Sequence, residues 1–227
     1  MPLNKKNILP VVVLISGTGS NLQALIDAIA QESLPVQICA VISNRPHAEG
    51  LTHALRAGIA TYPLDHSGYP DRDSFDAALM NVIDGYQPGL VLLAGFMRIL
   101  TRGFVEHYGG KLINIHPALL PEFPGLDTHR RAIAAGKTEH GASVHFVTPE
   151  VDGGPVILQA RVPVVPGDTP ERLAARVLIQ EHIIYPLALR WFAERRLRLL
   201  GNQVIFDDSA LSQPLLLESL HEVDTTS

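Results

Sequence analysis

The chain has 227 residues, of which 46% are hydrophobic and 18% are charged, which is enough apolar material for the core of a folded globular protein. Eighteen basic and 23 acidic residues give a net charge of -5, and no cluster of lysine and arginine forms a stripe for nucleic-acid phosphates. No apolar run approaches the roughly 18 to 20 residues of a membrane helix. The composition therefore excludes an integral membrane protein and disfavours nucleic acid as a partner.

The sequence contains one cysteine, Cys39, inside the apolar run 36–42, where we expect it to be part of the core. A single cysteine can form neither a disulfide within the chain nor a thiolate metal cage. The first apolar run begins at residue 8 and is too short for a signal segment. These features favour a protein of the reducing cytoplasm.

The first half of the sequence alternates between apolar, strand-like runs and helical patterns. Residues 8–15 form the first predicted strand, and a glycine-rich turn joins it to a helix. Further strands are predicted at 36–42, 60–62, 90–94 and 112–115, and further helices near 48–57, 71–84 and 101–107. Uniformly apolar strands that alternate with helices indicate an α/β fold with a mostly parallel, twisted sheet covered on both faces.

After residue 140 the pattern changes. Two strand-like runs, 142–147 and 156–165, are separated by a glycine-rich turn and no helix, which predicts an antiparallel hairpin. Thr169 then caps a long helix that begins with Pro170, with a kink expected at Pro186. No internal repeat is present, so we expect one domain.

The turn Gly17-Thr18-Gly19-Ser20-Asn21-Leu22 is similar to the start of a dinucleotide-binding fingerprint. Leu22 replaces the third glycine, and the second strand leads into Asn44 where an acidic residue would bind a ribose, so NAD is disfavoured. One interpretation is a phosphate site, in which backbone N–H groups and the helix dipole face an anion on a small substrate. The other is a tight connection capped by Ser20 or Asn21.

Polar residues gather at the end of the strand predicted at 112–115. The alternation of the strand sends Asn114 and His116 to one face, and Pro117, which has no amide donor, ends the ladder. Open α/β sheets bind ligands at such strand ends. An imidazole can exchange protons near neutral pH and an amide can stabilise an oxyanion, so the pair suits acyl transfer through a tetrahedral intermediate.

Asp152 opens the turn Asp152-Gly153-Gly154-Pro155, which we expect to be pliable enough to bring the carboxylate to His116. The alternative is that Asn114 and His116 only cap a strand and that Asp152 is an ordinary turn residue. No serine or cysteine carries a nucleophile signature, which favours direct transfer over a covalent intermediate. The ten histidines form no metal-binding motif, so we expect no metal.

Glu181 is out of place in the long helix, because it shares a face with apolar residues such as Val177 and Tyr185. A carboxylate at this position would be buried and would need a partner. It either pairs with a neighbouring arginine or histidine, or binds polar groups of a ligand.

Five motifs in this order resemble one family, the folate-dependent phosphoribosylglycinamide formyltransferases of purine synthesis. The resemblance covers roughly residues 11 to 193. The motifs are Leu14-Ile15-Ser16-Gly17-Thr18-Gly19-Ser20-Asn21-Leu22, Leu93-Ala94-Gly95-Phe96-Met97-Arg98-Ile99-Leu100, Asn114-Ile115-His116-Pro117, His140-Gly141-Ala142-Ser143-Val144-His145-Phe146-Val147 and Asp152-Gly153-Gly154-Pro155.

The resemblance implies a formyltransferase fold and transfer of the formyl group from 10-formyltetrahydrofolate to the amine of glycinamide ribonucleotide. Asn114, His116 and Asp152 match the catalytic trio of the family. The residues that match its substrate contacts are Gly19, Ser20 and Asn21 for the phosphate, Glu181 for the ribose, and Arg72. The residues that match its folate site are Met97, Arg98, Ile99, Leu100, Asn114, Thr148, Pro149, Glu150, Val151 and Asp152. The implied partners are small molecules, and a homodimer is compatible with the sequence.

On this basis we divide residues 8–206 into a phosphate-binding half, about 8–110, and a folate-binding and catalytic half, about 111–206. Residues 207–227 have little pattern and are expected to form a tail with little order. Among the departures from the family pattern, Asp127 matters most, because a carboxylate facing an anionic substrate would repel it. We expect Asp127 to cap a helix instead.

The sequence leaves three alternative functions to be considered. Formyltetrahydrofolate hydrolase and methionyl-tRNA formyltransferase share the same chemistry around the catalytic motif, but each family carries an additional domain that we do not expect here. A non-catalytic folate or nucleotide sensor would keep the scaffold without the activity, and the intact trio disfavours it.

Overall fold

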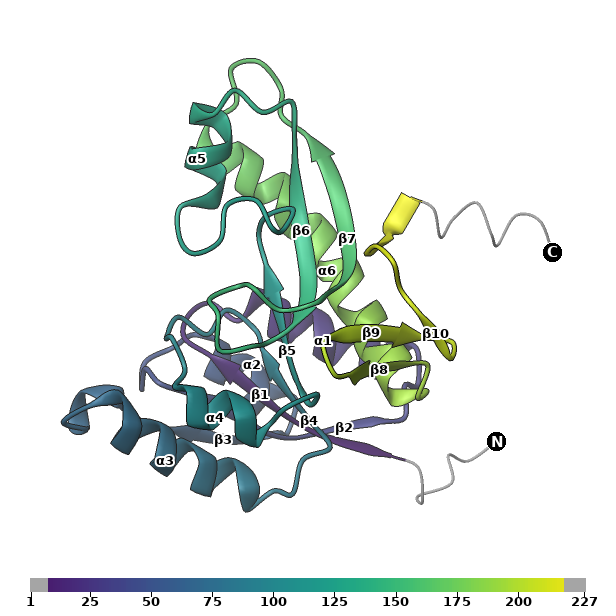
Figure 1. The fold of residues 1–227 in the computed structure, drawn as a ribbon. Helices are drawn as coiled ribbons and strands as arrows, with labels where there is room; N and C mark the ends of the chain where they lie inside the picture. The colour runs from purple at the N-terminus through teal and green to yellow at the C-terminus, as the bar shows by residue number, and fades with distance from the viewer. Residues whose placement is uncertain (1–7, 219–227) are drawn as a thin grey trace. The chain divides into compact units, whose positions relative to one another are not determined.

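The computed structural model describes residues 8–218 (Figure 1). The chain divides into two compact units, with the boundary between Asn114 and Ile115. Unit 1 is the part that ends at Asn114, and unit 2 begins at Ile115. Strand β5 (Leu112–His116) crosses this boundary.

Unit 1 contains a parallel sheet with the strand order β5-β4-β1-β2-β3. Besides β5, its strands are β1 (Leu9–Ile15), β2 (Val36–Ser43), β3 (Ala60–Pro63) and β4 (Leu90–Leu93). Its helices are α1 (Ser20–Gln31), α2 (Gly50–Arg56), α3 (Arg72–Asp84) and α4 (Arg102–His107), with the short 3-10 helix η2 (His66–Gly68). The predicted alternation of strands and helices, and with it the mostly parallel α/β fold class, is confirmed.

The central strands of unit 1 are enclosed because they have no polar face. Residues 11–15 of β1 and 90–92 of β4 are fully buried. Strands without polar alternation are stable only when both faces of their sheet are covered. Polar side chains can therefore occur at β1 and β4 only where the strand ends.

The glycine-rich turn between β1 and α1 is shaped by Gly19. This residue is the N-cap of α1, has a φ of 77° and offers no side-chain cap, so the predicted cap by Ser20 or Asn21 is wrong. A Cβ on Gly19 would lie 2.5 Å from the Cα of Gly50, the first residue of α2. Glycine is therefore required both for the positive φ and for the close approach of two backbones.

Unit 2 contains the predicted hairpin, in which β6 (Glu139–Phe146) and β7 (Val156–Pro163) pair antiparallel. The two-residue strand β11 (Leu215–Leu216) pairs parallel with β7. A separate antiparallel sheet consists of β8 (Leu197–Leu200), β9 (Gln203–Phe206) and β10 (Ser209–Ala210). The helices of unit 2 are α5 (Thr128–Ala134) and α6 (Pro170–Ala193).

The long helix α6 packs against β6 and β7 (Figure 1). As predicted, it begins at Pro170, and Oγ1 of Thr169 accepts a hydrogen bond from the backbone N–H of Arg172 at 3.3 Å. The helix continues through Pro186. None of the helices in the described part of the chain combines the length and the apolar character of a membrane span.

Some features differ from the sequence-based expectations or add to them. Cys39 in β2 is half-buried, so it is not part of the enclosed core. The hairpin of β8 and β9 was not predicted, because polar residues such as Arg198 interrupt its apolar pattern. Of the expected tail, residues 207–218 include β10 and β11, and the remainder lies outside the described residues.

Replacing Gly19 with alanine should lower the free energy of unfolding by about 1–3 kcal/mol, because the new Cβ meets the backbone of Gly50 in a strained conformation. Urea unfolding of the full chain measures this change. Gly17→Ala is the control, since a Cβ on Gly17 would meet no atom within 4 Å, and it should stay within about 0.5 kcal/mol of the parent. Equal stability of the Gly19 variant and the parent would contradict the role assigned to Gly19.

Candidate active site

His116 is the last residue of β5, and its side chain is buried. The backbone N–H of Ala118 donates to the carbonyl oxygen of His116 at 2.9 Å, and Pro117 between them has no donor to continue the ladder. Asn114 precedes His116 by two residues on the same strand, so the two side chains project from one face of β5. The strand therefore ends in a polar pair, as its sequence predicted.

Both ring nitrogens of His116 lie against acceptors of unit 2. Nδ1 is 3.4 Å from Oδ2 of Asp152, and Nε2 is 2.9 Å from the carbonyl oxygen of Phe123. An imidazolium can donate to both acceptors at once, whereas a neutral ring can donate to only one. The structure thus brings together the histidine and the carboxylate that the sequence had suggested as partners.

Asp152 is held by the backbone around it. Its Oδ2 accepts a hydrogen bond from the N–H of Gly125 at 2.8 Å, and its φ is 51°, a left-handed conformation that aspartate tolerates better than most residues. A Cβ on Gly154 would collide with the carbonyl oxygen of Phe146. The glycine at position 154 therefore allows close packing against the end of β6, and the turn brings the carboxylate of Asp152 to His116 as expected.

The chain that leaves His116 is anchored by side chains of β6 and β7. The hydroxyl of Ser143 donates to the carbonyl oxygen of Ala118 at 2.7 Å and accepts from the N–H of Leu120 at 3.0 Å. The amide of Gln159 donates to the carbonyl oxygen of Leu120 at 2.9 Å and to Oγ of Ser143 at 2.8 Å. Leaving such a buried group without its partner costs roughly 1–3 kcal/mol, so this network fixes the backbone beside His116.

A second histidine, His145 in β6, also faces Asp152, and the sequence had not marked it as a site residue. Its Nε2 lies 3.7 Å from Oδ1 of Asp152, and its Nδ1 lies 2.9 Å from the carbonyl oxygen of Phe146. Burial lowers the pKa of His145 to about 4, although the carbonyl of Phe146 and the carboxylate of Asp152 oppose this shift. A polar alternation like that of β5 was present in the sequence of β6 and could have indicated this residue.

His129 in α5 and His140 in β6 form a further pair of rings in unit 2, with centroids 5.2 Å apart. Burial lowers the pKa of His140 to about 4 and also lowers the pKa of His129, each with help from a neighbouring imidazole. Both rings are thus neutral at pH 7. Within residues 8–218, no three His, Cys, Asp or Glu side chains form a group that could hold a metal ion.

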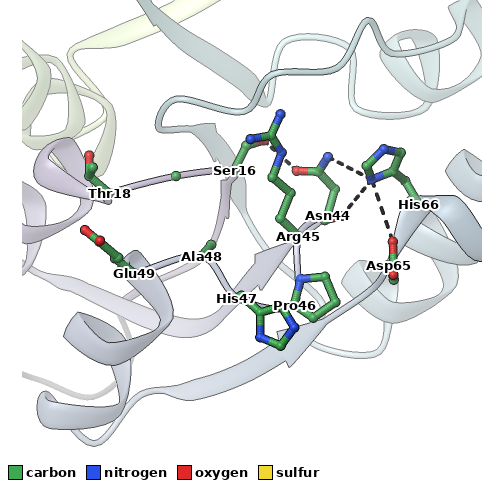
Figure 2. Close-up of a pocket in the computed structure, with 11 residues that line it drawn as sticks. Ser16, Thr18, Asn44, Arg45, Pro46, His47, Ala48, Glu49, Asp65 and His66 are labelled. Atoms are coloured by element: carbon green, nitrogen blue, oxygen red, sulfur yellow. Dashed lines mark hydrogen bonds and ion pairs between the residues drawn. The ribbon is translucent and has the colours of Figure 1, made fainter.

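In unit 1, a pocket of about 420 Å³ lies between the turn after β1 and the loops that follow β2 and β3 (Figure 2). Gly17 and Thr18 line it, and the predicted phosphate-binding residues Gly19, Ser20 and Asn21 come next in the chain. Because Gly19 provides no side-chain acceptor to the first turn of α1, the helix N-terminus is a candidate anion site.

The predicted folate-binding residues 97–100 lie in an irregular segment between β4 and α4. The N–H of Met97 donates to Oγ of Ser16 at 2.7 Å, and the N–H of Ser16 donates to the carbonyl oxygen of Gly95 at 3.1 Å. The structure therefore joins this segment to the start of the glycine-rich turn. Arg72, the other predicted substrate contact of unit 1, is exposed at the first position of α3.

The remaining predicted residues belong to unit 2. Glu181 of α6 is only 6% exposed, so its predicted burial is confirmed. Thr148, Pro149, Glu150 and Val151 lead into Asp152 in the connection between β6 and β7, and the side chain of Val151 is exposed.

Asp127 occupies the N-cap position of α5 but makes no cap hydrogen bond, so its predicted capping role is wrong. Its φ is 58°, and its carboxylate pairs with the guanidinium of Arg130 at the surface. The pairing partly neutralises the charge that would repel an anionic substrate.

Comparison with known proteins assigns the chain to a family. A sequence model of formyl transferases matches residues 9–189. The chain belongs to the formyl transferase family. It is 54% identical to the phosphoribosylglycinamide formyltransferase of Escherichia coli (strain K12), over 88% of this chain and 95% of that protein.

Solved structures of formyl transferases share the fold. The phosphoribosylglycinamide formyltransferase of Coxiella burnetii in complex with CHES has a TM-score of 0.87 and 53% identity, over 92% of this chain and 99% of that one. Glycinamide ribonucleotide transformylase 1 of Symbiobacterium toebii has a TM-score of 0.85 and 46% identity, over 88% and 94%. The formyltransferase fold that the five motifs implied is therefore confirmed.

The free energy of unfolding of this formyl transferase should fall as the pH is lowered from 7 toward 4. His140 and His145 have pKa values of about 4 in the folded protein, below the ordinary 6.5, so the unfolded chain takes up protons first. The loss of unfolding free energy begins below about pH 6.5. For each of these histidines it approaches about 1.4 kcal/mol per unit of difference between the pKa values of the unfolded and the folded protein. Urea unfolding at a series of pH values measures it.

His140→Asn should flatten this fall, because the amide does not titrate and its N–H can replace the ring N–H that bonds to the carbonyl of Pro117. His47→Asn, at an exposed position, is the control and should leave the slope unchanged. If parent and His140→Asn lost stability equally over this range, the assignment of the loss to the buried histidines would be wrong.

Proposed function

We propose that this chain transfers the formyl group of 10-formyltetrahydrofolate to the amine of 5-phosphoribosylglycinamide in purine biosynthesis. The observation that carries the proposal is the 54% identity to the Escherichia coli phosphoribosylglycinamide formyltransferase over 95% of its length. The pairing of His116 with Asp152 supports it, because formyl transfer needs a group that moves protons and a partner that orients it. The cytoplasm, which the sequence favours, is the proposed location.

In the proposed reaction the amine nitrogen attacks the formyl carbon, and the π electrons of the carbonyl bond move onto the formyl oxygen. The tetrahedral intermediate then breaks the bond between the formyl carbon and N10 of the folate, and this electron pair leaves with N10. The amine loses one proton and N10 gains one. The products are the formylated ribonucleotide and tetrahydrofolate, so the step balances without an oxidant or a metal.

We assign stabilisation of the oxyanion to Asn114 and His116, through an amide N–H and an imidazolium N–H. Asp152 orients the imidazole through Nδ1. The ring N–H that serves the substrate has to leave its present acceptor. If Nδ1 served the substrate, the pair with Asp152 would be lost. If Nε2 does, only its contact with the carbonyl oxygen of Phe123 opens, so we assign the proton-donating role to Nε2.

The substrates are assigned to the segments that the family resemblance indicates. The phosphate of the ribonucleotide is placed at Gly19, Ser20 and Asn21, where the uncapped start of α1 supports an anion. Glu181 is assigned to the ribose, and Arg72 is a further contact. The formyl donor is assigned to residues 97–100 and to residues 148–152, both of which expose apolar side chains.

The proposal is tested by mixing the purified protein with 10-formyltetrahydrofolate and following tetrahydrofolate release by absorbance, with and without the ribonucleotide. We expect release only when the ribonucleotide is present. Release in its absence would identify a hydrolase. Binding of both ligands without release would identify a sensor, and either of these outcomes would overturn the proposal.

His116→Ala should lower kcat by at least about 100-fold, because general acid–base groups typically contribute at least this factor. Circular dichroism shows whether the variant is folded. His107→Ala is the matched control, since His107 is an exposed histidine that pairs with Asp84, and it should keep parental turnover. Full activity in a folded His116→Ala protein would remove this residue from the mechanism.

A further inference from the structure

The chain between β4 and α4, which we call the 95–101 segment, has no regular secondary structure. Its side chains nevertheless point in two defined directions. Phe96 and Leu100 are buried in unit 1, whereas Met97 and Ile99 are 60% and 55% exposed. The segment therefore exposes two large apolar side chains, Met97 and Ile99, while Phe96 and Leu100 hold its backbone against the core of unit 1.

The first anchor of the 95–101 segment is the hydroxyl of Ser16, at the end of β1. Its Oγ accepts a hydrogen bond from the N–H of Met97 at 2.7 Å and donates to Oδ1 of Asn44 at 2.5 Å. The backbone N–H of Ser16 also donates to the carbonyl oxygen of Gly95 at 3.1 Å. One residue thus holds the backbone on both sides of Phe96.

Asn44, which follows β2, sets the direction of that hydroxyl (Figure 2). Because Oδ1 of Asn44 receives the proton of Ser16, a lone pair of the hydroxyl is left for the N–H of Met97. Nδ1 of His66 lies 2.8 Å from the backbone oxygen of Asn44 and 3.4 Å from its Nδ2. One ring nitrogen cannot donate and accept at once, so the shorter contact is the hydrogen bond, and it holds the backbone of Asn44.

The second anchor lies at the other end of the segment. The carboxylate of Asp76, in α3, accepts a hydrogen bond from the N–H of Thr101 at 2.6 Å. Asp76 is only 2% exposed, and a buried carboxylate is costly unless specific contacts compensate for its lost hydration. The guanidinium of Arg98 lies over the ring of Phe75, 4.7 Å from its centroid, and ties the middle of the segment to the same helix.

We propose that Ser16, Asn44 and Asp76 are positioning residues for the formyl donor. They hold the 95–101 segment so that Met97 and Ile99 form a fixed apolar surface for the flat ring system of the folate. This inference rests on the proposed function, in which the segment contacts the donor. Because none of the three residues is assigned to the reacting atoms, their loss weakens donor binding and leaves the chemical step intact.

Two substitutions remove the anchors one at a time. Ser16→Ala removes the acceptor of the Met97 N–H with little change in volume, and Asp76→Leu removes the acceptor of the Thr101 N–H. Asp76→Asn keeps an oxygen in the same place and is the conservative variant. Ser209→Ala, at an exposed position of β10, is the control for the loss of a serine hydroxyl elsewhere.

Ser16→Ala and Asp76→Leu should each raise the KM for 10-formyltetrahydrofolate about tenfold, which corresponds to about 1.4 kcal/mol. The kcat at saturating donor and the KM for the ribonucleotide should stay close to the parental values. Asp76→Asn should recover most of the donor affinity, and Ser209→Ala should match the parent in all three constants.

Two further measurements do not depend on turnover. Calorimetric titration with tetrahydrofolate should show weaker binding by Ser16→Ala and Asp76→Leu, and amide hydrogen exchange should be faster in a peptide that covers residues 95–101. If Asp76→Leu fails to fold, Ser16→Ala decides the test, because it removes a single oxygen atom.

A parental donor KM with parental exchange in Ser16→Ala would overturn the inference. Equal increases in the KM values of both substrates would overturn it as well, because they would indicate a general loss of structure. Failure of the proposed function is distinguishable, since the parent itself would then release no tetrahydrofolate with the ribonucleotide present. Tetrahydrofolate affinity and hydrogen exchange would in that case still decide whether Ser16 and Asp76 position the segment.

Discussion

Burial of β1 and β4 on both faces is the constraint on which the rest of the structure depends. Their side chains are apolar and the sheet satisfies the hydrogen-bonding groups of their backbone, so these two strands offer no place for a polar side chain along their length. Polar side chains appear where strands end, with Ser16 after β1, Asn44 after β2 and His116 as the last residue of β5. Sheets of this kind place their ligands at the carboxyl ends of the strands for the same reason.

Polar groups at such strand ends are still largely buried, and each therefore needs a partner. The same holds for buried polar groups inside a strand: the hydroxyl of Ser143, within β6, donates one hydrogen bond and accepts two, and all three go to the protein. His116 differs in kind. In the proposed reaction its Nε2 exchanges a protein acceptor for a substrate atom while Nδ1 keeps Asp152, which suits a group that moves protons.

The features that were predicted from the sequence are those that depend on periodicity and on neighbouring residues. Apolar runs marked the buried strands, and a polar pair before a proline marked His116 as a candidate for catalysis. The sequence could not report contacts between distant positions. The alternation of Ser143 and His145 in β6 could have marked His145 as a polar position, but it gives no sign that a carboxylate faces the ring. The collision that makes glycine necessary at position 19 involves Gly50, which no local pattern connects to the turn.

The two substrate-binding elements proposed for unit 1 are fixed by different contacts. The glycine-rich turn is held by α2, through the close approach of Gly19 to Gly50 and through the hydrogen bond from the N–H of Gly50 to the carbonyl oxygen of Gly17 at 3.0 Å. The 95–101 segment is held by Asn44, acting through Ser16, and by Asp76. Ser16 directly precedes Gly17 in the chain, but the contacts of its hydroxyl go to Asn44 and Met97 and not to Gly50, and contacts that share no partner usually contribute independently. Substitution of Ser16, Asn44 or Asp76 can therefore change the affinity for the formyl donor while the phosphate site keeps its geometry. For this reason the KM for the donor is expected to rise while the KM for the ribonucleotide stays the same.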